Sequence, residues 1–404
     1  MIDITRKCSR HNAVGGVTGA AIGPTIRDRI NAARVVCVLL MMYVHVPNGQ
    51  QTGSGLNTTI STRIDHWLES ILIEGPGRAS AALLSVVSGY LIIHTLARTN
   101  MSVVSLYNRR LFSIVVPMVF WAVLTCLIYL ALSQGRGNVM DSAYSWHEKL
   151  NFVLFIYEVP FGPTMHLGFL RDLFVCVLLS PLLLIFLQWF PAITIGILGF
   201  IYLSEHSGQL YIVLRPLVIL GFTIGMFLAM RPVRVVSLDR YWAWYLSLTG
   251  VFAVLIVWAN AELMSPVEAY LAELGISLKE SVLYPLCRLF GSLTIWCMLP
   301  LCKGVWFTRL VNCLVPYLFV AFCSHFLVLN VLFNGLWLPL IGDRDSCLFL
   351  LWFISAPMFA MCASIAMVQV TARVFPPLVK LMTGGRMQPG NARTEVNGRF
   401  LQIT

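Results

Sequence analysis

Apolar stretches separated by polar segments recur along most of this 404-residue chain. The hydrocarbon core of a bilayer requires a helix of about 20 apolar residues, so each stretch is a candidate membrane span. Ten such candidates are found, at residues 31–47, 79–97, 111–133, 167–189, 191–204, 211–230, 241–259, 281–302, 314–333 and 348–371. The pattern predicts an all-α, polytopic integral membrane protein with about ten transmembrane helices.

Composition and charge agree with this interpretation. Hydrophobic residues make up 58% of the chain and charged residues only 11%, whereas about a quarter of a soluble protein is charged. Most lysines and arginines fall in alternate connecting segments, which the positive-inside rule places in the cytoplasm together with both termini. The net charge of +10 therefore requires no nucleic-acid partner. We expect a basic cytoplasmic segment at 1–30, a ten-span domain at 31–375 and a flexible cytoplasmic tail at 376–404.

The first candidate span carries two ionisable residues, Arg34 and His45. On a helix their spacing corresponds to about 16 Å of rise and about 20° beyond three full turns. They are therefore expected to share a face, one near each side of the membrane. One interpretation is structural, with Arg34 reaching the inner headgroups and His45 ending the helix. In the other, Arg34 anchors an anion from the cytoplasm and His45 is a general base near neutral pH.

Other charged residues at membrane depth have open roles as well. Arg109 and Arg110 precede the third span and are either a topology signal or a phosphate clamp. Arg215 and Arg288 either line a donor path or belong to structural ion pairs. His325 lies near the middle of the ninth span, where a packing role and a functional role both stay open.

Arg171 and Asp172 lie in the fourth span at a depth similar to that of His45. Sequence neighbours on a helix point about 100° apart, so we do not expect them to pair with each other. Asp172 is expected either to orient the imidazole of His45 or to form an ion pair with Arg215 or Arg288.

The eleven cysteines form no C-x-x-C pair. They also form no His/Cys cluster at the spacing of metal ligands, so we interpret them as small apolar packing residues and predict no metal site. Ser88 and Gly89 in the second span are expected to permit close approach of another helix.

Several motifs, in order along the ten spans, resemble those of acyltransferase family 3, membrane enzymes that modify bacterial surface and exported glycans. The matching motifs are Arg34-x10-His45, Ser88-Gly89-Tyr90, Met165 to Leu173 with its Arg171-Asp172 pair, Leu220-Gly221-Phe222, and Ala321 to His325. Two positions depart from the family pattern. Ser113 replaces the second arginine of an Arg-x-x-Arg motif, and Gly168 replaces a tryptophan.

The resemblance implies transfer of an acyl group, acetyl being the commonest, from cytosolic acyl-coenzyme A to a hydroxyl of an exported or lipid-linked glycan. It implies a multi-pass protein of the bacterial inner membrane with acyl-CoA as co-substrate and no bound cofactor. Its partners would be membrane lipids, polysaccharide-export machinery, and an acceptor that is an exopolysaccharide, a capsule, an O-antigen or a lipid-linked oligosaccharide.

The implied roles fall into three groups. The catalytic residues would be His45, Arg34 and Asp172; the acyl-CoA ligands would be Arg109, Arg110, Arg215 and Arg288; the acceptor or oxyanion ligands would be Arg171, Arg78 and His325. Two other classes use the same buried charges. One is a transporter or flippase of a lipid-linked sugar, and the other is a non-catalytic membrane scaffold.

Overall fold

The computed structural model describes residues 23–47, 64–99, 102–132, 162–204, 214–231, 235–260, 278–302, 304–341 and 348–387, with isolated residues at 150, 153 and 270. These residues contain many helices and no strand. The α-helices are α2 (Pro24–Tyr43), α3 (Ile64–Leu72), α4 (Arg78–Thr99), α5 (Val103–Arg110), α6 (Val116–Leu132), α8 (Gly168–Trp189), α9 (Pro191–Leu203), α10 (Pro216–Met230), α11 (Trp242–Asn260), α13 (Tyr284–Met298), α14 (Val305–Leu314), α15 (Leu318–Leu332), α16 (Leu338–Ile341), α17 (Phe349–Val374) and α18 (Pro376–Thr383).

Short 3-10 or π-helical turns join several of these helices. The π-helical turns are η1 (Ile73–Gly77), η2 (Leu111–Val115), η5 (Lys279–Leu283) and η8 (Phe333–Trp337), and the 3-10 turns are η3 (Gly162–Leu167), η4 (Val235–Tyr241), η6 (Leu299–Cys302) and η7 (Val315–Tyr317). Several helices therefore run on beyond the predicted spans. One continuous helical stretch covers Trp67–Ala97, so Arg78 lies within a helix and not in a loop before it.

Each predicted span has a helix at its position, and seven helices among the described residues are long and apolar enough to cross a membrane. Two more, α9 and α10, are apolar but shorter. The helix at the first predicted span, α2, begins at Pro24 and not near residue 31. The all-α membrane fold is therefore confirmed. The count of ten spans and the cytoplasmic position of both termini remain predictions.

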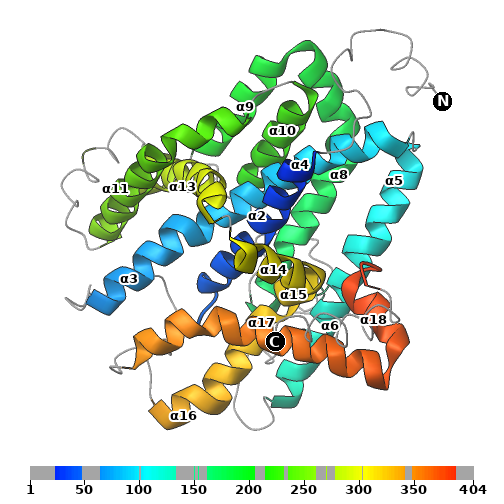
Figure 1. The fold of residues 1–404 in the computed structure, drawn as a ribbon, viewed down its shortest axis with the longest axis vertical. Coiled ribbons are helices and arrows are strands. Elements are labelled where there is room, and N and C mark those ends of the chain that lie inside the picture. The colour runs from blue at the N-terminus through cyan, green and yellow to red at the C-terminus, as the bar shows by residue number, and fades with distance from the viewer. Residues whose placement is uncertain are drawn as a thin grey trace.

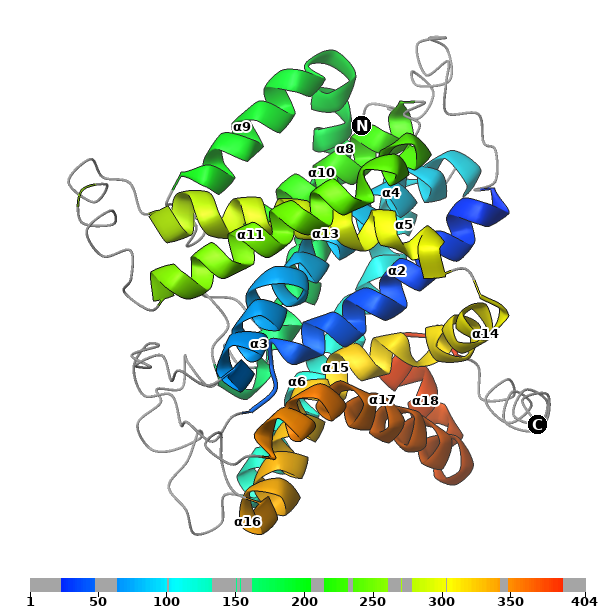
Figure 2. The same ribbon diagram turned by 60° about the vertical axis from the view of Figure 1, so that its left-hand side comes forward.

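Helix α2 runs through the middle of the molecule (Figures 1 and 2). It packs on α4 on one side and on α14, α15 and α17 on the other. Helices α9, α10, α11 and α13 gather on the α4 side, while α15, α17 and α18 lie on the opposite side (Figure 2). The residues of α2 therefore face both halves of the bundle.

Glycines bring α4 and α10 into backbone contact, as predicted for Gly89. A Cβ atom on Gly89 would collide with the carbonyl oxygen of Phe222, and one on Gly225 would collide with that of Val86. Small residues permit this approach between membrane helices. The contact fixes α4, which carries Arg78, against α10, which begins directly after Arg215.

The chain after the last long helix was expected to be flexible from residue 376. The structure instead forms helix α18, whose Val379 and Met382 are buried. Val379 and Met382 face the apolar core, and this burial explains the order. Residues 388–404 lie outside the described part of the chain, as does the segment before residue 23.

Candidate active site

His45 lies just beyond the C-terminal end of α2 and not on its helical face. The helix ends at Tyr43, and the His45 N–H donates to the carbonyl of Met42 at 3.0 Å in the turn that follows. The carbonyl of Pro47 accepts a hydrogen bond from the Trp352 indole of α17 at 3.2 Å. The shared helical face predicted for Arg34 and His45 is therefore wrong in detail, because the helix ends before Pro47, which cannot donate a backbone hydrogen bond.

The imidazole of His45 lies in a cluster of three histidines from three elements. Its ring centre is 5.3 Å from that of His325 on α15 and 6.2 Å from that of His166 in η3. The rings of His166 and His325 are 4.9 Å apart, and Phe326 stacks on His166 at 5.4 Å. We call His45, His166 and His325 the histidine cluster.

His166 is a site residue that sequence reasoning missed. It stands next to Met165 at the opening of the fourth span, inside a motif that carried the family resemblance, but no role was assigned to it. The only signal was its position, two residues before the first helical residue of α8. A single histidine at that place does not predict contact with residues 45 and 325.

Backbone carbonyls determine which nitrogens of two of these rings carry hydrogen. Nε2 of His166 lies 2.9 Å from the carbonyl of Cys323, and Nδ1 of His325 lies 2.7 Å from that of Phe322. Since a carbonyl only accepts, these nitrogens must donate. The opposite nitrogens, His166 Nδ1 and His325 Nε2, are buried and have no hydrogen-bond partner among the described residues. The same is true of His45 Nδ1. When the rings are neutral, His166 Nδ1 and His325 Nε2 can each accept a proton.

Two arginines, each paired with a buried acid, adjoin the histidine cluster. Nε of Arg78 lies 2.9 Å from Glu74, and Nε of Arg215 lies 2.8 Å from Asp172. Each arginine side chain is 38% exposed, whereas its acid is almost fully buried. Both arginines lie near enough for their charges to act on the His45 imidazole.

The π-helical turn η1 explains how Arg78 reaches this place. Pro76 interrupts the regular helix there, since proline has no N–H for the backbone ladder. Gly77 packs so tightly that a Cβ atom would lie 2.9 Å from the side chain of Val44. Arg78 follows Gly77 and His45 follows Val44 in the chain. The contact between Gly77 and Val44 therefore holds Arg78 and His45 near each other.

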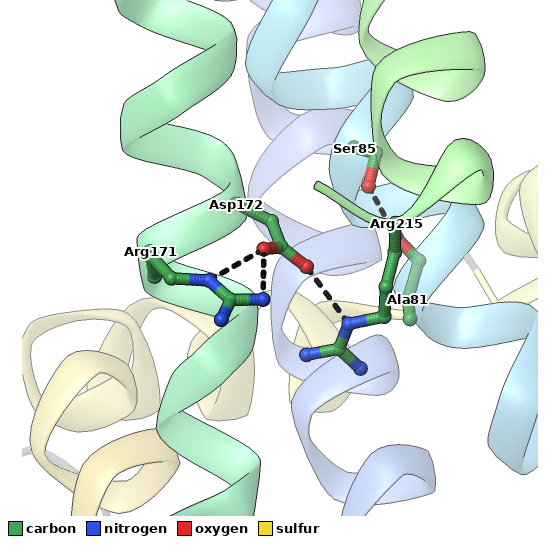
Figure 3. A network of polar contacts seen from close by, with 5 residues as sticks. All are labelled: Ala81, Ser85, Arg171, Asp172 and Arg215. Atoms are coloured by element: carbon green, nitrogen blue, oxygen red, sulfur yellow. Dashed lines mark hydrogen bonds and ion pairs between the residues drawn. The ribbon is translucent and has the colours of Figure 1, made fainter. Parts of the chain in front are cut away.

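Asp172 is the central acceptor of a network that includes both neighbouring arginines (Figure 3). Arg171 donates to Oδ1 of Asp172 from Nε at 2.9 Å and from Nη2 at 2.7 Å. Arg215 donates to Oδ2 at 2.8 Å. The expectation that Arg171 and Asp172 would not pair is wrong, because the long arginine side chain bends across the 100° between them.

The pairing of Asp172 with Arg215 is one of the alternatives predicted. Arg288 forms no ion pair in the described part of the chain. Its guanidinium lies 5.6 Å from the ring centre of Tyr284, the same ring that Arg78 approaches to 6.0 Å. No described contact joins Asp172 to His45, so orientation of the imidazole by this carboxylate has no support in the geometry.

A second group of cations lies toward the other end of α15. Arg386, which follows α18, is near enough to Arg34 of α2 and Arg110 of α5 for both of their charges to act on it. We call these three residues the arginine cluster. Among the described residues none of the three forms an ion pair. Arg109 is exposed and its charge acts on Arg110, but it is not counted in this cluster.

Helix α15 connects the two clusters. Phe319 near its start lies under the Arg386 guanidinium at 3.9 Å, and His325 follows six residues later. This spacing corresponds to about 9 Å of helical rise. The two clusters therefore adjoin positions about two helical turns apart on α15, and the residues between these positions are buried.

Two other features bear on ligands. The described residues contain no group of His, Cys, Asp or Glu with the arrangement of a metal site. An apolar cavity of about 200 Å³ lies between α2, α4, α10 and α13, lined by residues such as Leu83, Leu220 and Leu293. None of the candidate site residues lines it, so it is separate from both clusters.

Comparison with known proteins agrees with the family resemblance. A family described as an acyltransferase domain matches residues 27–369. The succinoglycan biosynthesis protein ExoH of Rhizobium meliloti (strain 1021) is 25% identical over 365 residues, which cover 89% of this chain and 93% of that protein. No solved structure matches the chain significantly. The chain therefore belongs to acyltransferase family 3 and is a membrane-bound enzyme of the O-acyltransferase type.

Proposed function

We propose that this enzyme transfers an acyl group, acetyl in the first instance, from cytosolic acyl-CoA to a hydroxyl of an exported or lipid-linked polysaccharide. The single observation that carries the proposal is the placement of His45 among two further histidines and two acid-paired arginines. Similarity to a succinoglycan biosynthesis protein supports a polysaccharide as acceptor.

His45 acts as the general base in the proposed reaction. It removes the proton from the acceptor hydroxyl as the oxygen attacks the thioester carbonyl. The C–O bond forms and the C–S bond breaks, and the proton held on the imidazole passes to the departing thiolate of coenzyme A. His166 and His325 each present a ring nitrogen without a described partner, and they orient His45 and share this proton.

Arg78 and Arg215 stabilise the negative charge that develops on the thioester oxygen. Their guanidinium groups are partly open, and the buried carboxylates of Glu74 and Asp172 fix their positions. Arg171 is buried and turned toward Asp172, which favours a supporting role for it over direct contact with the oxyanion. This arrangement supplies positive charge next to the base without protonating it.

Arg34 and Arg110 bind the phosphates of the donor at the cytoplasmic side. Arginine pairs with phosphate through two parallel hydrogen bonds. The side chain of Arg34 forms no hydrogen bond with the described residues, so its donors can serve a phosphate. Coenzyme A cannot cross a bilayer because it is highly charged, so its thioester must approach from within. We infer that the donor enters at the arginine cluster and that its thioester reaches the histidine cluster.

In the topology we propose, ten helices cross the bacterial inner membrane and both termini are cytoplasmic. The alternating distribution of lysine and arginine supports it, as does the helix found at each of the ten predicted positions. Cysteine accessibility to a membrane-impermeant reagent in whole cells tests it. Labelling of an engineered cysteine at residue 400 from the outside contradicts a cytoplasmic C-terminus.

The enzyme assay uses the purified full-length protein in lipid nanodiscs, acetyl-CoA, and de-O-acylated exopolysaccharide from the producing strain. We expect release of free coenzyme A together with new O-acetyl esters on the polysaccharide, in equal amounts. Thiol release is measured optically, and ester formation is measured by NMR of the polysaccharide. Absence of both products with acetyl-CoA and with succinyl-CoA refutes the proposal.

A further inference from the structure

The guanidinium of Arg386 is held in one position by contacts on three sides. Gly384 and Gly385 have φ values of +60° and +73°, in the left-handed region that favours glycine, and they turn the chain back after α18. Nη1 of Arg386 donates to the carbonyls of Ser113 at 2.7 Å and Thr383 at 3.0 Å. The Phe319 ring covers one face of the group.

The segment that carries Arg386 is itself attached to the bundle. The indole of Trp121 on α6 donates to the carbonyl of Met382 at 3.1 Å, and the side chains of Met382 and Met387 are buried. A Cβ atom on Gly384 would crowd the carbonyl of Ser113. Ser113 lies three residues after Arg110, so these contacts place Arg386 beside the end of α5.

Within the described part of the chain, the hydrogen bonds of Arg386 leave most of its donors without a partner. The recorded bonds use Nη1 alone, and a guanidinium carries further N–H groups on Nη2 and Nε. No described acid pairs with Arg386, Arg34 or Arg110. Three like charges so close together repel one another unless an anion lies between them.

We propose that Arg386 is the third arm of the donor-phosphate site and binds the nucleotide end of acyl-CoA together with Arg34 and Arg110. The inference rests on the proposed function. Coenzyme A carries a diphosphate and a separate ribose phosphate, so three guanidinium groups have three phosphate groups to meet. Arg386 lies outside the residues that the family matches, which end at 369. The C-terminal segment therefore contributes a donor ligand from beyond the shared domain.

The experiment compares two donors that differ only at the end proposed to contact Arg386. Acetyl-CoA carries the phosphates, and acetyl-pantetheine carries the same thioester without them. The variants are Arg386→Gln, the conservative Arg386→Lys and the matched control Lys380→Gln, an exposed lysine on α18. All are full-length proteins in nanodiscs, assayed with de-O-acylated exopolysaccharide.

We expect Arg386→Gln to raise KM for acetyl-CoA about tenfold, the equivalent of 1.4 kcal/mol of binding, while kcat stays unchanged. KM and kcat for acetyl-pantetheine stay at the wild-type values. Arg386→Lys recovers part of the loss, and Lys380→Gln behaves as wild type.

Four results overturn the inference. Equal loss of activity with both donors assigns Arg386 a structural role only, and unchanged KM for acetyl-CoA removes it from the site. If the wild type consumes neither donor, the proposed function fails and takes the inference with it. A wild type that uses acetyl-CoA as efficiently as acetyl-pantetheine, with no gain from the phosphates, also excludes a phosphate site.

Discussion

The histidine cluster and the arginine cluster both adjoin helix α15, through His325 and Phe319, but differ in how nearby charges are paired. Beside the histidine cluster each cation has a buried acid, Glu74 for Arg78 and Asp172 for Arg215. In the arginine cluster no described acid pairs with any of the three cations. The difference indicates that protein carboxylates position the cations beside the histidine cluster, whereas the arginine cluster favours an anionic ligand.

The same difference suggests separate roles: catalysis at the histidine cluster and binding of the donor at the arginine cluster. A balanced site keeps its geometry with or without substrate, as a catalytic site requires. An unbalanced cationic site gains its stability from the ligand itself. Substitutions in the histidine cluster should therefore lower kcat, and substitutions in the arginine cluster should raise KM for the donor.

The largest effect is expected from His45→Ala. Loss of a general base lowers the rate by about 10²–10⁴-fold, so O-acyl content of the exported polysaccharide should fall to background in a complemented deletion strain. The matched control is His94→Ala, which removes a histidine of α4 that lies beside Tyr90. Wild-type acylation by the His45 variant, at equal protein level, contradicts the role of His45.

Asp172→Asn tests the balance of charge beside the histidine cluster. Removing the carboxylate that accepts from both Arg171 and Arg215 takes away the shared acceptor of a buried network, at a cost of about 3–5 kcal/mol in unfolding free energy. Chemical denaturation in lipid–detergent micelles measures it. Asp239→Asn, at a partly exposed ion pair with Arg29, should cost clearly less. Equal losses would mean that burial does not distinguish the two pairs.

A comparison of Arg215→Gln with Arg110→Gln tests whether the two clusters have separate roles in catalysis and in donor binding. The first removes an oxyanion ligand, so kcat should fall about 10²-fold with little change in KM for acetyl-CoA. The second removes a phosphate ligand, so KM should rise about tenfold at constant kcat. Steady-state kinetics with acetyl-CoA distinguish the two. The comparison fails if both variants change the same constant.

The smallest effect is expected from Arg109→Gln. Its side chain is exposed, so KM for acetyl-CoA should change less than twofold, in line with other exposed charges. The measurement is the same kinetic assay. A tenfold increase would extend the arginine cluster to Arg109 and restore the clamp that sequence reasoning predicted from Arg109 and Arg110 together.

Hydropathy predicted where the helices lie but not how they begin and end. A run of apolar residues is a property of local composition, so each of the ten predicted spans has its helix. The π-helical turn at Pro76 and the turn after Tyr43 depend instead on contacts such as that of Gly77 with Val44. These contacts join residues that are distant in sequence and have no local signal.

The candidate site was predicted in its residue types more than in its pairings. The paired motif of Arg34 and His45 was informative, whereas His166 needed the fold to bring it to His325. Arg386 was overlooked because its glycine-rich surroundings are typical of disorder. Side-chain length also matters, since the bend of Arg171 onto Asp172 is not visible from helical angles alone.

The backbone contact between α4 and α10 has a consequence for how substrates enter. With Gly89 against Phe222 and Gly225 against Val86, neither helix can slide along the other without steric collision, so we expect the two to move as one body. The loop bearing His45 belongs to neither helix and is attached to α17 through Trp352, so its position relative to the pair depends on that single indole hydrogen bond more than on backbone packing.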